Sequence, residues 1–347
     1  MSKVIVGMSG GIDSSFAAYI LKRKGLDVTG AFLNFSGSRN PEKLEKIQAI
    51  CKILDIPLAV ADCSDLFASS VITPFIESYL SGFTPNPCII CNANVKFKVL
   101  IDLACKTRSL FVASGHYAKI SESSDGSFSI RRGDDIRKDQ SYMLYRLKHK
   151  WFPKLLFPLG SWEKRKLQQE AVTVFGNIFN GEKESQDICF INGKSHDEFI
   201  MDEIGPSADE SGTIIDVEGN ILGEYNALFR YTIGQRKGLN LSGGPWFVLS
   251  MDPVGRKIIV GPEESLFPSV INCTSPVWHD NVFIGEVLHA QHRYRTQPVK
   301  VRISSFGKDC FSVDVLGKMR APAPGQSLVL YRADELVGGG IITSAEE

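Results

Sequence analysis

The chain has 347 residues, with 39 basic and 39 acidic side chains and a formal net charge of zero. This length is too great for one ordinary core and predicts two or three domains. The apolar fraction of 43% and the charged fraction of 22% are typical of a globular protein and exclude a disordered chain. The zero net charge disfavours a simple basic nucleic-acid binder, so any RNA contact must come from local patches.

The apolar runs of the chain are short. None approaches the roughly 18 residues that a membrane span needs, and the first eight residues do not have the features of a secretory signal. We therefore expect no membrane association and a cytoplasmic location. In that reducing compartment the eight cysteines are expected to be thiols, ligands or catalysts rather than structural disulfides.

The first half of the chain alternates strand and helix patterns. We expect strands at 3–8, 28–35, 58–61 and 110–114, and helices at 14–24, 41–54 and 95–105. This rhythm predicts an α/β domain built on a doubly wound parallel sheet.

The pattern changes near residue 195, and from about residue 270 it becomes purely β. Alternation with period two at 299–303, 311–316 and 327–331 predicts a small closed β-barrel. We expect three domains: an α/β domain at 1–197, a small central β-rich domain at 198–267, and a C-terminal barrel at 268–347.

A glycine loop follows the first expected strand, and a helix follows the loop. Glycines let the backbone approach an anion closely, and a helix start presents free N–H groups and the positive end of its dipole. The loop has no lysine after its glycines, so it is neither the GxxxxGK[ST] loop nor the dinucleotide GxGxxG. We expect it to bind phosphate through Gly7, Met8, Ser9, Gly10, Gly11, Ile12, Asp13 and Ser14. The loop resembles the SGGxDS signature of PP-loop pyrophosphatases, which implies cleavage of ATP to AMP and pyrophosphate.

Three cysteines are candidates for chemistry: Cys88 and Cys91, between two expected helices, and Cys189 far downstream. A thiol just before a helix start can have its pKa lowered by the helix dipole. Three interpretations stay open: half of a zinc site, with His116 as a further ligand; an iron–sulfur cluster held by all three thiols; and sulfur transfer by Cys91 and Cys189. The cysteines expected to be small buried apolar residues are Cys51, Cys105, Cys273 and Cys310.

Two basic clusters also stand out. Lys164, Arg165 and Lys166 are expected on an exposed helix face. His292-Arg293-Tyr294-Arg295 interleaves cations with an aromatic ring, which suits base stacking and phosphate binding.

Five further segments, in this order, carry a specific resemblance: TPNPCIICN at 84–92, SGHY at 114–117, KDQS at 138–141, SQDICF at 185–190 and YTIGQRKGL at 231–239. Together with the glycine loop they resemble the bacterial tRNA-specific 2-thiouridylase family, over essentially the whole chain. The resemblance implies ATP-dependent 2-thiolation of the wobble uridine, position 34, of tRNA. In this reaction the C2 carbonyl oxygen is adenylated and sulfur arrives from a cysteine persulfide. It implies ATP, with Mg²⁺, as cofactor, tRNAs for Lys, Glu and Gln as partners, and a sulfur-relay or cysteine desulfurase protein as donor.

The resemblance also implies roles for single residues. Cys91 is the expected nucleophile and Cys189 the persulfide carrier. Leu33 and Gly115 are further nucleotide contacts, and Asn86, Pro87 and Cys88 face the target base. The expected tRNA contacts are His116, Lys138, Asp139, Gln140, Arg293, Tyr294 and Gln326. Many members have Asp where this chain has Cys88, which leaves the general base open and supplies a third sulfur for a cluster.

Two other function classes compete. A small-molecule adenylating ligase would use the same loop but would not need Cys91 or Cys189. A non-catalytic RNA-binding protein would not need an intact SGGIDSS loop.

Overall fold

The computed structural model describes residues 1–36, 41–181, 188–191, 193–205 and 211–346 of the chain. The chain forms two compact units. The first comprises Met1–Val71, Cys88–Ser185 and Asp334–Leu336, and the second comprises Ile72–Pro87, Gln186–Ala333 and Val337–Glu347.

The first unit is built on a five-stranded sheet in which every pair of neighbours is parallel. The strand order is β3 (Leu58–Asp62), β2 (Asp27–Asn34), β1 (Lys3–Gly7), β4 (Phe111–Ala113) and β7 (Leu155–Leu156). The side chains of β1 between Lys3 and Gly7 are completely buried, as expected for a central strand covered on both faces. The expected doubly wound parallel sheet is therefore confirmed.

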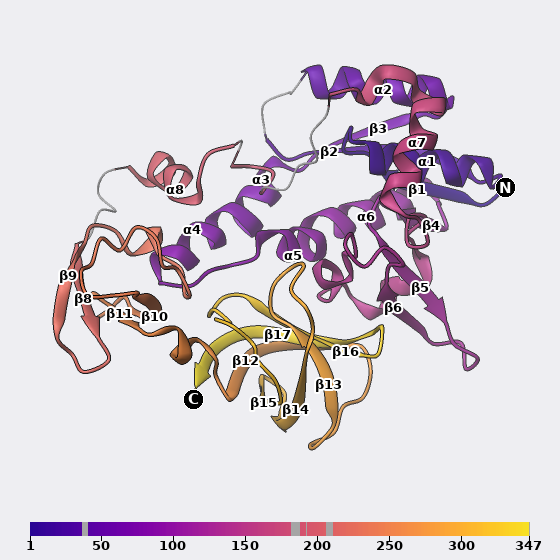
Figure 1. Cartoon of the computed structure of the whole chain (residues 1–347). Helices are drawn as coiled ribbons and strands as arrows, with labels where there is room; N and C mark the ends of the chain where they lie inside the picture. The colour runs from indigo at the N-terminus through magenta and orange to yellow at the C-terminus, as the bar shows by residue number, and fades with distance from the viewer. Residues whose placement is uncertain (37–40, 182–187, 192, 206–210, 347) are drawn as a thin grey trace. The chain divides into compact units, whose positions relative to one another are not determined.

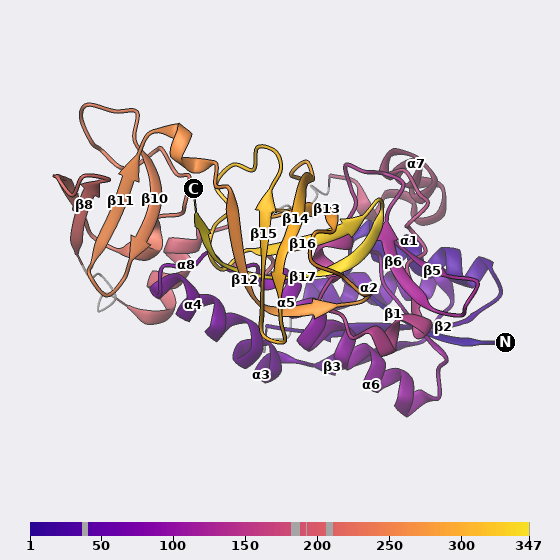
Figure 2. The same ribbon diagram turned by 90° about the horizontal axis from the view of Figure 1, so that it is seen from below.

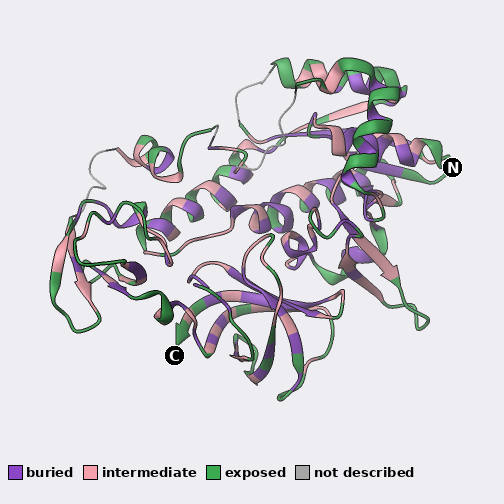
Figure 3. Cartoon of the chain, in the orientation of Figure 1, coloured by how far each residue is buried: buried purple, intermediate pink, exposed green. Residues whose placement is uncertain are grey.

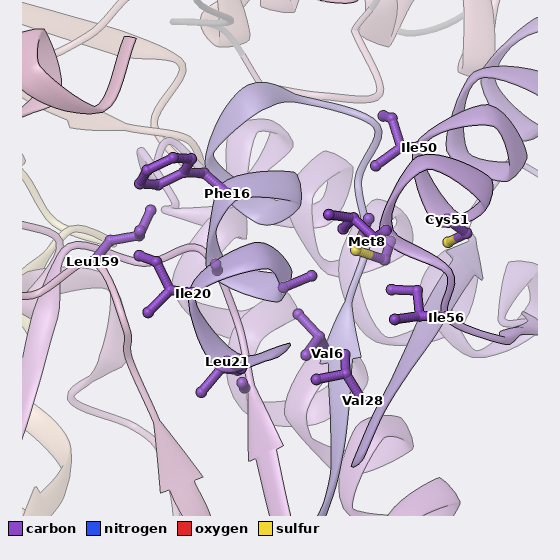
Figure 4. Packing of buried hydrophobic residues seen from close by; sticks show 14 of the residues in the cluster. Val6, Met8, Phe16, Ile20, Leu21, Val28, Ile50, Cys51, Ile56 and Leu159 are labelled. Atoms are coloured by element: carbon purple, nitrogen blue, oxygen red, sulfur yellow. The ribbon is translucent and has the colours of Figure 1, made fainter. Parts of the chain in front are cut away.

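Helices cover both faces of this sheet (Figure 1). On one face lie α1 (Ile12–Arg23), α2 (Pro41–Leu54) and α7 (Lys164–Phe175), and on the other lies α6 (Phe97–Thr107). The apolar sides of α1 and α2 meet β1 and β2 in one core, whose side chains include Val6, Phe16 and Ile50 (Figure 4). This core fixes the end of β1 and the start of α1, where the glycine loop lies.

The remaining elements of the first unit are short. A hairpin of β5 (Ala118–Glu122) and β6 (Phe128–Arg132) was not expected from the sequence, and the first residue of β17, Glu335, pairs with it. The short helical segments are α3 (Ser64–Phe67), η1 (Ala68–Ile72), α5 (Pro87–Cys91), η2 (Asn92–Lys96), η3 (Ser141–Leu144), η4 (His149–Lys154) and η5 (Gly176–Phe179).

The second unit contains a small mixed sheet and two helices. The sheet has the order β10 (Phe247–Asp252), β11 (Lys257–Gly261), β8 (Gly212–Asp216) and β9 (Ile221–Tyr225). The helices are α4 (Thr73–Leu80) and α8 (His196–Ile204), and the 3₁₀ turns are η7 (Leu228–Arg230) and η8 (Glu263–Leu266). Aromatic side chains of α4 and α8, such as Phe75 and Phe199, share one apolar cluster.

The second unit also contains a closed six-stranded barrel, which confirms the expected C-terminal barrel (Figure 2). Its strands are β12 (Val270–Trp278), β15 (Cys310–Val315), β14 (Val299–Phe306), β13 (Val287–Gln291), β16 (Ser327–Arg332) and β17 (Glu335–Glu346), and β12 pairs with β17 to close it. Buried residues alternate with more exposed ones along β14, whereas β16 is buried along almost its whole length (Figure 3). Among the helices that the structure describes, none is long and apolar enough to cross a bilayer.

Candidate active site

The glycine loop is a compact turn held by its own serines. Ser14 Oγ donates to the Gly11 carbonyl at 3.0 Å and accepts from the Ser9 backbone N–H at 3.1 Å. Gly10 has φ of +81°, a conformation that glycine adopts without strain. Gly11 caps α1, whose first backbone N–H groups have no acceptor within the helix. The loop is therefore shaped as an anion cradle at the positive end of a 12-residue helix.

A cavity of about 250 Å³ opens beside this loop. Its walls come from the ends of β1, β2 and β4, where parallel α/β sheets bind ligands. The expected nucleotide contacts that line it are Gly7, Met8, Ser9, Asp13, Ser14, Leu33 and Gly115, whereas Gly10, Gly11 and Ile12 do not. Lys43, Lys96, His116 and Gln140 line it as well.

Gly115 lies against the start of α1. A Cβ atom on this residue would lie 2.7 Å from the Asp13 carbonyl carbon and 2.7 Å from the Ser14 nitrogen. Real Cβ atoms do not approach backbone atoms this closely, so only glycine fits without moving the loop. The turn after β4 thus forms one wall of the cavity by packing directly on the glycine loop.

Lys164 was expected on an exposed helix face, and this expectation is wrong. The residue is 6% exposed, and its Nζ lies 2.6 Å from Asp13 Oδ1. Tyr117 Oη donates to the same oxygen at 2.7 Å. The spacing of Lys164, Leu167, Ala171 and Phe175 on the buried face of α7 is the signal that could have placed it correctly.

His116 and Ser114 form a pair at the cavity wall. Ser114 Oγ and His116 Nδ1 are 2.7 Å apart. Burial, and then the nearby charge of Lys96, hold the pKa of His116 well below its usual value. The imidazole is therefore neutral at physiological pH and does not supply a cation for RNA phosphate.

Asp139 and Gln140 hold a turn rather than face solvent. Asp139 is 6% exposed, and its carboxylate accepts from Arg132 Nη1 at 2.9 Å and from the Gly133 backbone N–H at 3.0 Å. The backbone and side chain of Ser141 donate to the same carboxylate. These bonds give Asp139 a positioning role in the turn, and its expected contact with tRNA stays a prediction. Lys138, next to it, is half-buried.

Gln140 contributes to the cavity wall. Its Oε1 accepts from the Tyr117 backbone N–H at 3.1 Å, and its own N–H donates to the Tyr117 carbonyl at 2.8 Å. These two bonds hold Gln140 beside the strand end that carries Ser114 and Gly115.

Cys88 and Cys91 both lie within the short helix α5, not ahead of a helix as expected. Cys88 is half-buried and Cys91 is 8% exposed. The π-helical turn η2 follows directly and leads into α6, so the thiols and Lys96 belong to one continuous helical run.

Cys189 belongs to the second compact unit, whereas Cys91 belongs to the first. Its thiol is exposed. The flanking side chains are anchored, because Ile188 and Phe190 pack on the cluster that contains Phe75 and Phe199. Residues 182–187, which include the expected motif positions before Ile188, lie outside the described residues.

The four cysteines that were expected to be buried divide into two groups. Cys51 and Cys273 are buried in cores as expected, and burial raises the pKa of both thiols. Cys105 and Cys310 are exposed, so the expectation of burial is wrong for them. The buried stripe of α6 includes Ala104 but not the next residue, Cys105. Cys310 is the first residue of β15.

The loop before Cys88 is tied to the barrel. Gln326 Nε2 donates to the Thr84 carbonyl at 2.8 Å, and the Thr84 N–H donates to the Pro324 carbonyl at 2.8 Å. All of these residues belong to the second unit. The expected base-contacting residues Asn86 and Pro87 therefore follow a loop that Gln326 holds, a link that the sequence did not reveal.

Arg293 reaches the central domain, where its Nη2 donates to the Ile233 carbonyl at 3.4 Å. Arg293 Nη2 donates to the Ala321 carbonyl at 2.8 Å, while Tyr294 carries the exposed Arg295 over its ring, with 5.1 Å from the guanidinium carbon to the ring centroid. Arg293 thus has a structural contact, and Arg295 presents its cation to solvent.

No group of three or more His, Cys, Asp and Glu side chains is placed to hold a metal ion within the residues that the structure describes. The zinc and iron–sulfur interpretations therefore stay hypotheses.

Comparison with known proteins decides the family. A family model described as "tRNA methyl transferase HUP domain" matches residues 2–193, and models described as "tRNA methyl transferase PRC-barrel domain" and "Aminomethyltransferase beta-barrel domain" match 197–262 and 270–342. A protein named "tRNA-specific 2-thiouridylase MnmA" from Clostridium perfringens is 38% identical over 99% of this chain and 98% of its own length. A protein of the same name from Clostridium botulinum is 37% identical over 98% of this chain and 97% of its own length.

The chain belongs to the tRNA-specific 2-thiouridylase family. This family is one of sulfurtransferases, so the chain is an enzyme of that class, as the sequence motifs implied. A solved 4-thiouridine synthetase–RNA complex with bound ATP is similar over 51% of this chain and 42% of its own length, with 15% identity and a TM-score of 0.31. A TM-score this low supports no inference about function.

Proposed function

We propose that this chain thiolates tRNA by adenylating the C2 oxygen of the wobble uridine with ATP and replacing that oxygen with sulfur. The observation that carries the proposal is the cavity lined by the glycine loop and Gly115. Cys91 lies five positions before Lys96, which lines the same cavity and belongs to the same helical run. Membership of the 2-thiouridylase family supports tRNA as the substrate.

Adenylation makes the C2 oxygen of the uridine a good leaving group. A uracil carbonyl oxygen is a poor leaving group, and AMP on that oxygen makes it a good one. The C2 oxygen attacks the α-phosphorus, the bond between the α- and β-phosphates breaks, and its electron pair leaves with pyrophosphate. The glycine loop would bind the phosphates through backbone N–H groups at the start of α1.

Mg²⁺ would accompany ATP, since oxygen ligands and phosphates are what this ion prefers. Asp13 is the carboxylate among the residues that line the cavity, and a carboxylate suits Mg²⁺. The ion would offset charge on the phosphates.

Sulfur transfer would use both thiols. The terminal sulfur of a Cys189 persulfide attacks C2 and displaces AMP, and the Cys91 thiolate then attacks Cys189 Sγ and breaks the sulfur–sulfur bond. The sulfur on C2 is reduced, the two cysteines are oxidised to a disulfide, and an external thiol must reduce them again. In the alternative order Cys91 first releases hydrosulfide from the persulfide, and hydrosulfide attacks C2. The exposed thiol of Cys189 suits loading by a donor protein.

The partners follow from this chemistry. We propose the tRNAs for Lys, Glu and Gln as acceptors, a sulfur-relay or cysteine desulfurase protein as donor, and action in the cytoplasm. The target base must leave the anticodon stack to reach the cavity. Asn86, Pro87 and Cys88 would face the base, and Lys138, Tyr294 and Arg295 would contact the RNA.

An iron–sulfur cluster held by Cys88, Cys91 and Cys189 is the alternative route for sulfur. Replacement of Cys88 by Asp, the residue common in the family, separates the two. Sulfur transfer by persulfide predicts that Cys88→Asp keeps activity, whereas a cluster predicts that it loses iron and activity together. The measurement is iron and sulfide content after anaerobic purification, with thiolation followed in parallel.

The deciding experiment is mass spectrometry of nucleosides from tRNA treated with the chain, ATP and a persulfide source. The proposal predicts 2-thiouridine together with AMP and pyrophosphate. A small-molecule ligase would release pyrophosphate without tRNA, a methyl transfer would release none, and a non-catalytic binder would modify nothing. Any of these three results would overturn the proposal.

A further inference from the structure

The cavity beside the glycine loop must balance the negative charge of a triphosphate without a lysine in the loop itself. The loop offers backbone N–H groups and serine hydroxyls, but Asp13 brings a negative charge to the same wall. Lys164 compensates that charge directly, because its Nζ lies 2.6 Å from Asp13 Oδ1. The described lysines that line the cavity are Lys43 and Lys96.

Lys96 is held in place by a buried amide. Its Nζ donates to Asn92 Oδ1 at 2.9 Å, and Asn92 Nδ2 donates to the Met143 carbonyl at 3.0 Å. Asn92 is 3% exposed, so both ends of its amide group are used inside the protein. This clamp fixes the ammonium group at the cavity wall, and a fixed charge loses little entropy when an anion binds.

His116 lines the same cavity, and burial, followed by the charge of Lys96, holds the pKa of its imidazole well below its usual value.

Lys43 has a different setting. It belongs to the first turn of α2, and its Cγ lies 3.7 Å from the position that a Cβ on Gly10 would take. Its stem thus packs on the outside of the glycine loop.

We propose that Lys96 is the phosphate-binding cation of this site, which takes the place of the lysine that the glycine loop does not contain. It binds the triphosphate of ATP and stabilises the charge that develops on the departing pyrophosphate during adenylation. The step transfers no proton to or from Lys96. This inference rests on the proposed function, because it assumes that ATP is the ligand.

The test compares three variants with the wild-type chain. Lys96→Met removes the charge and keeps the aliphatic stem, Lys96→Arg keeps the charge, and Lys98→Met is the matched control on an exposed site two residues away. Calorimetry measures the affinity for inorganic pyrophosphate and for ATP, and rapid quench measures tRNA-dependent pyrophosphate release.

We expect Lys96→Met to bind pyrophosphate at least 30-fold more weakly and to release it about 10²- to 10³-fold more slowly, the range found when one preorganised donor is removed. Lys96→Arg should retain most of the binding, and Lys98→Met should match the wild type. Lys96→Gln is the second uncharged variant, used if Lys96→Met lowers the melting temperature, because the glutamine amide can still donate to Asn92. We expect the same loss of pyrophosphate binding and release in Lys96→Gln.

Binding and release within threefold of the wild type in both uncharged variants would overturn the assignment of Lys96. That outcome is distinct from failure of the proposed function, in which the wild-type chain itself releases no pyrophosphate with ATP and tRNA.

Discussion

Lys164 Nζ donates a hydrogen bond to Asp13 Oδ1 across 2.6 Å, and this contact ties α7 to the glycine loop. The two residues are far apart in the sequence, and Tyr117 completes the contact from the turn after β4. The pair fixes the Asp13 carboxylate at the wall of the cavity. The site therefore depends on three separate segments of the first unit.

Removal of the Lys164 charge should weaken both the fold and nucleotide binding. Breaking a buried pair by removing one partner costs about 3–5 kcal/mol. The Asp13 side chain is 35% exposed, so we expect Lys164→Met to cost about 2 kcal/mol, below that range. ATP affinity should fall about tenfold, because the freed carboxylate repels the phosphates.

Thermal unfolding and calorimetric ATP titration measure these two effects. Lys166→Met is the control, since Lys166 lies on the same helix with a side chain 66% exposed. An unchanged melting temperature and ATP affinity in Lys164→Met would show that the contact does not support the loop.

A methyl group at position 115 should displace the glycine loop. Because the new Cβ would lie 2.7 Å from two backbone atoms of the loop, the turn after β4 must move. Overpacking of this kind costs about 1–3 kcal/mol, and we expect the KM for ATP to rise more than tenfold. Steady-state kinetics of Gly115→Ala measure this, and Gly307→Ala, where the nearest atom is 3.8 Å away, should behave like the wild type. Normal ATP kinetics in Gly115→Ala would contradict the close packing.

Four cysteine variants test the sulfur chemistry. Cys91→Ser and Cys189→Ser should each reduce 2-thiouridine formation at least 10³-fold, because a serine cannot carry or accept sulfur. Cys105→Ser and Cys310→Ser are matched controls, since these thiols are exposed but lie outside the expected site. In Cys189→Ser we expect tRNA-dependent pyrophosphate release to continue. Full thiolation by both Cys91→Ser and Cys189→Ser would exclude sulfur transfer by these residues.

Gln326 should act through the loop before Cys88. Its amide holds the Thr84 carbonyl, so Gln326→Leu should leave that loop less ordered and should lower kcat for thiolation about tenfold. A direct contact with tRNA would instead raise the Kd for tRNA and leave kcat nearly constant. Filter binding and single-turnover kinetics separate the two cases, and Gln297→Leu, at an exposed site in the same barrel, is the control.

The sheet, the barrel and the glycine loop could be predicted from the sequence because each depends on neighbouring residues. The apolar run of β1, the Pro at the start of α2 and the period-two strands are local patterns. The contacts that shape the site are not local. The bond between Asn92 and Met143 and the bond between Thr84 and Gln326 join distant segments, and no local pattern predicts them.

The predicted burial of two single residues is wrong because each lies at the edge of a helix face. Lys164 was grouped with two exposed neighbours, although its spacing with Leu167 and Ala171 places it on the buried face of α7. Cys105 was placed on the buried stripe of α6, although the stripe passes through Ala104 instead. Charge and apolarity alone therefore misplace a residue at the edge of a helix face.

The central claim is that sulfur passes from Cys189 to the tRNA with the help of Cys91. The most direct test is a single turnover with ³⁴S-persulfide loaded on Cys189, ATP and tRNA, in the absence of added reductant, followed by mass spectrometry of nucleosides and peptides. We predict ³⁴S in 2-thiouridine and one Cys91–Cys189 disulfide for each uridine modified. Unlabelled 2-thiouridine, or labelled product with both thiols still reduced, would contradict the account.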